Sequence, residues 1–172
     1  MTTPRILVLL VIVAVAVPTS AVAAAGSGSS RAGSGIGWRG WGVRVGVTDD
    51  PDQVVGGVHF NLGEFVPRLR FQPDVQLGFG DDATTLFATA PVHYRFELDR
   101  EFVPYVGGGV SFGFVDRDLP PTSNADDTEF EAGFKATGGL EWSLSGGRAF
   151  LVELSLGFGD VHDVQIVGGW SF

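Results

Sequence analysis

Charged side chains in this chain occur singly within stretches that alternate apolar and polar residues. Four of them are basic and four are acidic: Arg44, Arg70, Arg95 and Lys135, and Asp74, Glu131, Glu141 and Glu153. An unpaired charge is costly away from water, whereas opposite charges can neutralise one another there. The equal numbers therefore predict a network of ion pairs within a narrow enclosed space.

Three histidines are the candidates for acid–base chemistry. His59 and His93 occupy the same polar positions as the charged residues, which favours hydrogen-bonded structural roles. His162 falls in a predicted loop, and Ser155 and Ser171 are interpreted as fillers of the interior rather than as nucleophiles. No loop has the spacing of a calcium-binding EF-hand. We therefore expect no catalytic residue, no cofactor and no defined set of metal-ligating residues.

Eight segments with a two-residue period must position these side chains. They span residues 41–47, 54–62, 69–79, 86–96, 106–114, 130–142, 150–158 and 164–172. None carries a charge on its apolar positions, and the longer ones have the roughly 10 residues that a tilted membrane-crossing strand needs. Strands whose apolar face meets lipid must belong to a closed sheet. The pattern predicts an all-β fold, an eight-stranded antiparallel up-and-down transmembrane β-barrel.

The amino terminus is typical of an exported protein. Arg5 precedes an apolar run over residues 6–17 and three alanines at 23–25. Because a spanning helix needs about 20 apolar residues, residues 1–25 are interpreted as a cleaved signal peptide. Residues 26–36 are expected to form a flexible tail, and residues 37–172 the barrel domain. The chain has no cysteine, which excludes disulfides and a lipid anchor at the cleavage site.

Acidic residues gather in the connections predicted to lie outside the cell. With the amino terminus in the periplasm, these are residues 48–53, 80–82, 115–129 and 159–163, which hold 12 carboxylates and one basic residue, Arg117. The periplasmic turns are shorter, as outer-membrane barrels require. Two explanations remain open: the loops bind divalent cations or a cationic surface partner, or they form a solvated rim. The net charge of −9 excludes a nucleic-acid partner.

Three segments resemble a known family. Residues 103–110, VPYVGGGV, look like the "PY-V-G-x-G" strand of the OmpA/OmpX/opacity-type outer-membrane β-barrel domain family, and residues 134–142 resemble its next strand. The last strand, with Trp170 and Phe172, is similar to the assembly signal of such barrels. The resemblance implies a barrel without a cofactor in the bacterial outer membrane. Its expected partners are outer-membrane lipid and the barrel-assembly machinery, and its expected role is structural or surface interaction.

Three other functions compete with this one. A soluble periplasmic, lipocalin-like carrier would turn the phenylalanines inward, but glycine-rich polar positions favour a crowded lumen. A lipid-A-modifying barrel enzyme should need a histidine, whereas a structural barrel should tolerate His162→Ala. A pore for large solutes is disfavoured because eight strands leave room only for side chains. If the lumen is plugged by ion pairs, neutralising Lys135 should lower thermal stability.

Two prolines could disturb this interpretation. Pro73 and Pro91 fall inside predicted strands, where each removes a ladder hydrogen bond. A bulge at either one would reverse the inward and outward positions beyond it in the same strand. His93 and Arg95 are the assignments that depend most on this point.

Overall fold

The computed structural model describes residues 35–49, 52–80, 83–98, 101–117 and 128–172. All eight segments that the sequence predicts as strands lie within these ranges. The predicted signal peptide (residues 1–25) and residues 26–34 of the predicted tail lie outside the described residues, as do residues 118–127 of the longest predicted loop.

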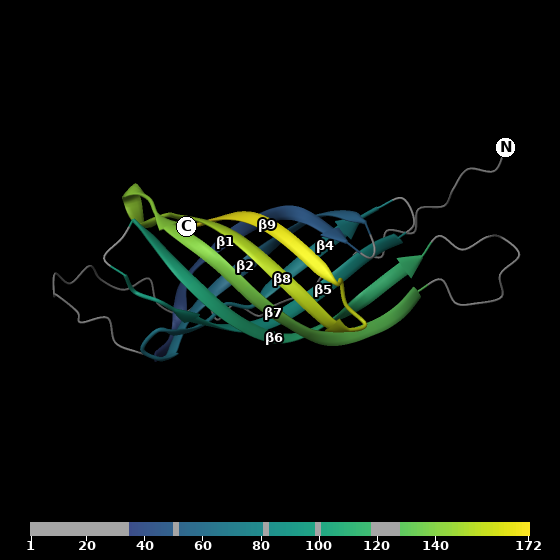
Figure 1. The fold of residues 1–172 in the computed structure, drawn as a ribbon, viewed down its shortest axis with the longest axis horizontal. Helices are drawn as coiled ribbons and strands as arrows, with labels where there is room; N and C mark the ends of the chain where they lie inside the picture. Colours follow the sequence, from purple (N-terminus) through teal and green to yellow (C-terminus); the bar gives the residue numbers. More distant parts are fainter. Residues whose placement is uncertain (1–34, 50–51, 81–82, 99–100, 118–127) are drawn as a thin grey trace, which may run out of the picture. The chain divides into compact units, whose positions relative to one another are not determined.

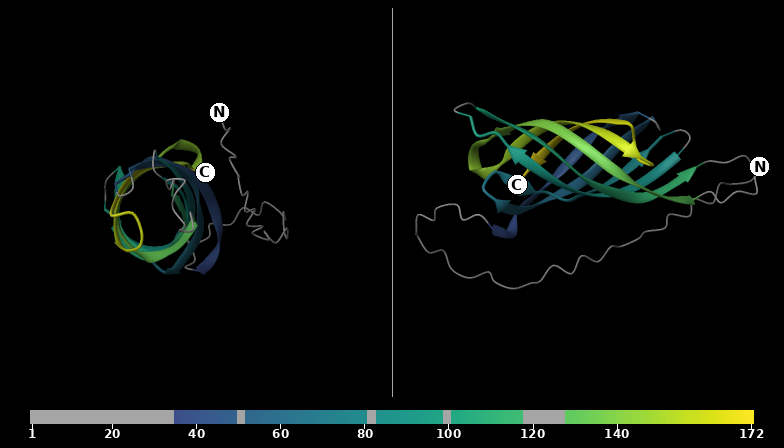
Figure 2. Two further views of the ribbon diagram at one scale, coloured as in Figure 1. Left: turned by 90° about the vertical axis from the view of Figure 1, so that its right-hand side faces the viewer. Right: turned by 60° about the horizontal axis from the view of Figure 1, so that its bottom comes forward.

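Antiparallel strands account for nearly all of the described residues (Figure 1). They are β1 (Gly35–Asp49), β2 (Gln53–Val66), β3 (Leu69–Phe71), β4 (Asp74–Phe79), β5 (Ala83–Arg95), β6 (Phe102–Arg117), β7 (Thr128–Ser143), β8 (Ala149–Gly159) and β9 (Val164–Ser171). The sheet has no free edge among these strands, because β1 pairs with β2 on one side and with β9 on the other. The sheet therefore closes into a ring, visible end-on in Figure 2.

The strands β3 and β4 are two halves of one interrupted strand. Gln72 and Pro73 separate them, and both halves pair with β2 and β5. The backbone N–H of Gln72 donates to the carbonyl of Pro91 at 3.2 Å, which keeps the interrupted strand attached to β5. Arg70 before the break and Asp74 after it are both buried, so the break does not reverse the faces. Counting β3 and β4 together, the predicted eight-stranded barrel is confirmed.

Some strand ends differ from the sequence prediction. β1 begins at Gly35, so the predicted flexible tail ends two residues too late. β6 runs to Arg117 and β7 starts at Thr128, so the predicted loop over residues 115–129 begins and ends within strands. The cause is cross-strand pairing, since Val115 pairs with Glu129 and Asp116 with Thr128. Polar residues near a strand end thus stay in the ladder.

The two faces of the sheet have opposite character. Val43, Val45 and Val47 on the outer face are 38–54% exposed, whereas Arg44 between them is 4% exposed. Most of the large apolar side chains face outward in this way, and most of the buried residues are polar or charged. This inverts the usual arrangement of a water-soluble protein. The lumen therefore takes the place of a core.

The barrel has two distinct ends. The terminal end is where β1 begins and β9 ends, and the loop end is where β6 ends and β7 begins (Figure 1). At the terminal end, β7 and β8 are joined through a short 3-10 turn, η1 (Ser145–Gly147). No helix within the described residues is long and apolar enough to cross a membrane, a criterion that concerns helices alone.

Glycine on the lumen face makes room for large rings. A Cβ added at Gly42 would lie 2.4 Å from the ring of His59, and one added at Gly139 would lie 2.4 Å from the ring of Tyr105. Real Cβ atoms do not approach other atoms so closely. The glycine-rich polar positions of the sequence thus reflect a lumen filled by a few bulky side chains from facing strands.

Candidate functional site

The middle of the lumen holds a cluster of charges from three strands. Arg44 Nη1 of β1 lies 3.0 Å from Glu153 Oε1 of β8 and 3.6 Å from Asp74 Oδ2 of β4. Tyr105 donates its hydroxyl to Glu153 at 2.9 Å, and Gln76 donates its amide to Asp74 at 2.6 Å. All three charged residues are at most 4% exposed. We call Arg44, Asp74 and Glu153 the central cluster.

A second cluster lies nearer the terminal end. Glu141 of β7 accepts hydrogen bonds from Arg70 at 2.6 Å and from Arg95 at 2.8 Å, one on each carboxylate oxygen. The guanidinium of Arg70 also lies over the ring of Tyr105, 5.7 Å from its centroid. Because Tyr105 touches both groups, it connects this terminal-end cluster to the central one. Each arginine donates one charge-assisted hydrogen bond to Glu141, so both carboxylate oxygens are satisfied without a bidentate pair.

Two of the eight charged residues in the predicted network form no ion pair with either cluster, and Lys135 is joined to Asp74 only through Gln165 and Gln76. Lys135 Nζ is 3.4 Å from the amide oxygen of Gln165, and no carboxylate of the described residues lies within 4.0 Å of it. Glu131 pairs with the half-exposed Arg117 at 2.6 Å, at the loop end. Both lie toward the loop end. The sequence alone could not predict this, because the stagger between neighbouring strands sets the position of each side chain along the barrel axis. The other six residues form ion pairs in the lumen.

His59 and Ser171 form the contact most like a catalytic pair, but the histidine tautomer gives their hydrogen bond the wrong direction for catalysis. His59 Nε2 lies 2.9 Å from Ser171 Oγ, and Arg44 Nε donates to His59 Nδ1 at 3.2 Å. A guanidinium can only donate, so Nδ1 must accept and the neutral ring carries its proton on Nε2. Activation of a serine nucleophile needs the opposite tautomer. Nδ1 must then donate its proton to a carboxylate, and Nε2 must be unprotonated to accept the proton of the serine hydroxyl. This pair is therefore a structural hydrogen bond.

His93 is fully buried beside Tyr105, with ring centroids 4.9 Å apart. Neither ring nitrogen has a hydrogen-bond partner among the described residues. A catalytic base needs an orienting group at its second nitrogen. His93 therefore fills the lumen in an inward position, on the side that strand parity predicts.

The connection between β8 and β9 folds into the loop end of the barrel. Val161 and His162 are 6% and 4% exposed, and the His162 ring lies 4.9 Å from the ring of Phe87 in an edge-on contact. Val161 belongs to an apolar cluster with Ala83, Phe87 and Val115. The sequence predicted His162 in a surface loop. The only sequence signal that this loop turns inward is the apolar Val161 between Asp160 and Asp163. His162→Ala would remove packing whether or not the residue is catalytic, so that substitution does not discriminate an enzyme.

His162 predicts a pH dependence of stability. Burial, reinforced by the charge of Lys135, lowers the pKa of His162 to about 4, while Phe87 packs against its ring and Asp160 and Asp163 flank it along the chain. The unfolded chain binds this proton near pH 6.5, but the folded protein does not until about pH 4. The stability that the neutral ring contributes is therefore complete above about pH 6.5 and is lost as the pH falls toward 4, by up to about 3 kcal/mol.

The measurement is the difference in unfolding free energy between the wild type and His162→Gln, taken at about pH 7 and about pH 4.5. Because both proteins share all other titratable groups, the contributions of those groups cancel in the difference between wild type and variant at each pH. The gap in favour of the wild type should narrow at the lower pH. An equal gap at both values would show that His162 is not held neutral by burial.

The predicted assembly residues lie on the outer face at the terminal end. Trp170 and Phe172 are 43% and 51% exposed. The ring of Phe172 lies 5.3 Å from that of Trp41, and Trp170 lies 5.0 Å from Phe150. Phe172 N also donates to the carbonyl of Trp41 at 2.7 Å, which fixes the end of β9 to β1. Their role as an assembly signal stays a prediction.

The geometry by itself defines a class of protein. A closed ring of eight antiparallel strands, apolar outside and charged inside, is the architecture of a transmembrane β-barrel. No group of three or more His, Asp or Glu side chains in the described part of the chain could hold a metal ion.

Comparison with known proteins agrees on the fold. The structure is similar to that of Neisserial surface protein A (NspA), with a TM-score of 0.61 and 14% identity over 78% of this chain and 97% of that one. It is also similar to the N-terminal β-barrel domain of Pseudomonas aeruginosa OprF, with a TM-score of 0.62 and 11% identity over 79% of this chain and 98% of that domain. No family model and no curated sequence matches the chain. At these identities the likeness shows a shared fold, the eight-stranded outer-membrane type.

Proposed function

We propose that this chain is a structural or surface-interaction protein of the bacterial outer membrane, with a lumen closed by ion pairs. The observation that carries the proposal is the reversal of the two faces. Large apolar side chains cover the outside, while Arg44, Asp74 and Glu153 are buried inside. Such a surface is stable only in contact with lipid or another apolar phase.

Aromatic side chains on the outer face support the membrane location. Trp142, Phe150 and Trp170 form a continuous row at the terminal end, with ring centroids 5.0–5.8 Å apart. At the loop end, Phe114 and Phe130 pair in the same way, 5.6 Å apart. Girdles of aromatic residues at both ends of an apolar band are typical of outer-membrane barrels. NspA, which shares the fold, is named a surface protein.

The lumen favours a plug over a channel for large solutes. The central and terminal-end clusters cross the barrel interior. Arg44 on β1 links Glu153 on β8 to Asp74 on β4, on the opposite side of the ring. Arg70 on β3 reaches Glu141 on β7, with β5 and β6 between them in the ring. At the loop end, the apolar cluster that contains Val161 adds a third obstruction. Neither a soluble carrier, which needs an apolar cavity, nor a barrel enzyme, which needs an activated nucleophile, fits these side chains as well.

A surface partner would meet the acidic loops. Of the described carboxylates at the loop end, Asp116 accepts from Thr128 and Glu129 pairs with Arg117. These contacts tie the ends of β6 and β7 together at the two ends of the connection over residues 118–127. A cationic partner, or divalent cations, is the ligand class that the charge of these loops fits.

The test is to fractionate cells and to run the outer-membrane fraction on a denaturing gel, unheated and boiled. A closed barrel in the outer membrane should migrate differently after boiling. The purified protein should also give no passage of large solutes in a liposome-swelling assay. A protein in the soluble periplasmic fraction with no heat-dependent shift would contradict the proposal.

A further inference from the structure

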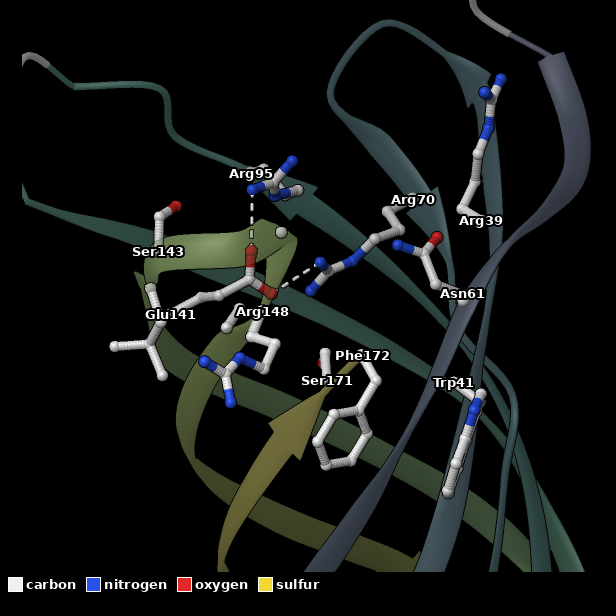
Figure 3. Close-up of a pocket in the computed structure, with 14 residues that line it drawn as sticks. Arg39, Trp41, Asn61, Arg70, Arg95, Glu141, Ser143, Arg148, Ser171 and Phe172 are labelled. Atoms are coloured by element: carbon white, nitrogen blue, oxygen red, sulfur yellow. Dashed lines mark hydrogen bonds and ion pairs between the residues drawn. The ribbon is translucent and has the colours of Figure 1, made fainter. Parts of the chain in front are cut away.

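A basic cavity of about 270 Å³ opens at the terminal end of the barrel (Figure 3). Its described lining contains four arginine side chains and one carboxylate side chain, an excess of positive charge: Arg39, Arg70, Arg95 and Arg148, with Glu141. Glu64 lies beside the lining, 4.0 Å from Arg95. The arginines come from β1, β3, β5 and the turn that follows η1. The lumen charges otherwise balance, so this excess is a local feature of the cavity.

Arg70 has hydrogen-bonding capacity that the protein does not use. Its side chain is 5% exposed, and its Nη1 donates to Glu141 at 2.6 Å. Its Nε and Nη2, and the Nε of Arg95, have no hydrogen-bond partner among the described residues. Burying a charged donor without an acceptor is costly. These three nitrogens are shielded from solvent, so Arg70 contributes positive charge to the cavity that it lines rather than open hydrogen-bond sites.

The neighbouring residues add donors at the mouth of the cavity. Arg148 makes one long contact, from its Nε to the carbonyl of Ser145 at 3.4 Å. Figure 3 shows Asn61 beside Arg70, and Ser143 on the same side as Arg95. Both are short polar side chains in the lining. The lining thus surrounds a small volume with cationic and neutral hydrogen-bond donors.

We propose that this cavity binds a phosphate group, as the free ion or as part of a small soluble phosphomonoester. Arginine forks match phosphate oxygens in pairs. An excess of positive charge fits a dianion better than a monocarboxylate. The cavity shares Arg39, Asn61, Arg70 and Arg95 with a neighbouring hollow of about 820 Å³, so the ligand class follows from the charge of the lining and not from its volume. This site goes beyond the proposed role of the barrel and does not depend on its membrane location.

The test is a titration of the full chain in a phosphate-free maltoside detergent. Inorganic phosphate replaces chloride at constant ionic strength, above the second pKa of phosphate. The readout is the NMR signal of the arginine Nε–H groups, with glycerol 3-phosphate and acetate as further probes. We expect a saturable shift of the Arg70 signal with phosphate. A saturable shift with glycerol 3-phosphate as well would show that the site accepts a phosphomonoester, and no shift with it would show that the site takes only the free ion.

The variant that decides the result is Arg148→Gln, because Arg148 lies in no ion pair of the described residues and its loss should leave the barrel folded. Its affinity for phosphate should fall about tenfold. Arg117→Gln, at the loop end, is the matched control and should bind as the wild type does. Heat-dependent gel migration verifies folding of both. A non-saturable shift, an unchanged Arg148→Gln, or acetate binding as tightly as phosphate would overturn the proposal.

Discussion

Replacing Arg44 with methionine is expected to lower the free energy of unfolding by about 3–5 kcal/mol. Arg44 is the only cation within 4.0 Å of Glu153 and Asp74 among the described residues, and all three side chains are at most 4% exposed. Methionine keeps most of the volume but leaves two buried carboxylates without their counter-charge. The measurement is denaturant unfolding of the refolded protein, followed by gel mobility without heating.

A matched control separates this effect from a general loss of charge. Arg117 also pairs with two carboxylates, Glu129 and Glu131, but it is 42% exposed at the loop end. Arg117→Met should cost less than about 1 kcal/mol, because solvent screens an exposed pair. Equal losses for Arg44→Met and Arg117→Met would show that burial adds nothing to the central cluster.

A double-mutant cycle tests the pairing itself. If Arg44 and Glu153 act on each other, the double variant with methionine at both positions should be more stable than the sum of the single losses implies, by about 0.5–3 kcal/mol. Neither substitution removes an atom of the hydrogen bond that Gln76 donates to Asp74. Purely additive losses would mean that the two residues stabilise the barrel separately.

Sequence reasoning could predict the faces of the sheet because a strand has a fixed period of two. Arg44 and Arg70 face inward through that rule alone, and the break at Pro73 did not disturb it because the chain resumes in the same phase. Partners could not be predicted in this way. Arg44 and Glu153 are 109 positions apart, and their contact depends on how far β1 and β8 are staggered around the closed ring.

The position of each lumen side chain along the barrel axis could not be predicted from the sequence. Glu131 and Lys135 lie on the correct face, yet Glu131 is near enough to the loop end to reach Arg117. The same limit applies to His162, since a loop that folds inward leaves no periodic trace. The basic cavity was also missed, because Arg39 precedes the first predicted strand and Arg148 lies in the connection between the sixth and seventh predicted strands. Their proximity arises only when the sheet closes.

A charge placed on the outer face should be strongly destabilising in a bilayer. Leu154 lies in the middle of β8 and is 47% exposed. Leu154→Arg should cost about 2–4 kcal/mol in phospholipid bilayers if this position meets the bilayer midplane. Unfolding is measured in vesicles, with Leu154→Ala as the reference for lost side-chain volume.

Depth dependence makes this prediction specific to a membrane. Phe158, four residues further along β8, faces outward near the loop end and is 57% exposed. Phe158→Arg should cost only about 0–1 kcal/mol relative to its own alanine variant, because the penalty for arginine falls toward the interface. In water, both positions are exposed and arginine should be tolerated at each. A flat profile, with neither variant destabilised, would therefore mean that the apolar outer face does not lie in lipid and would require another apolar partner to cover it.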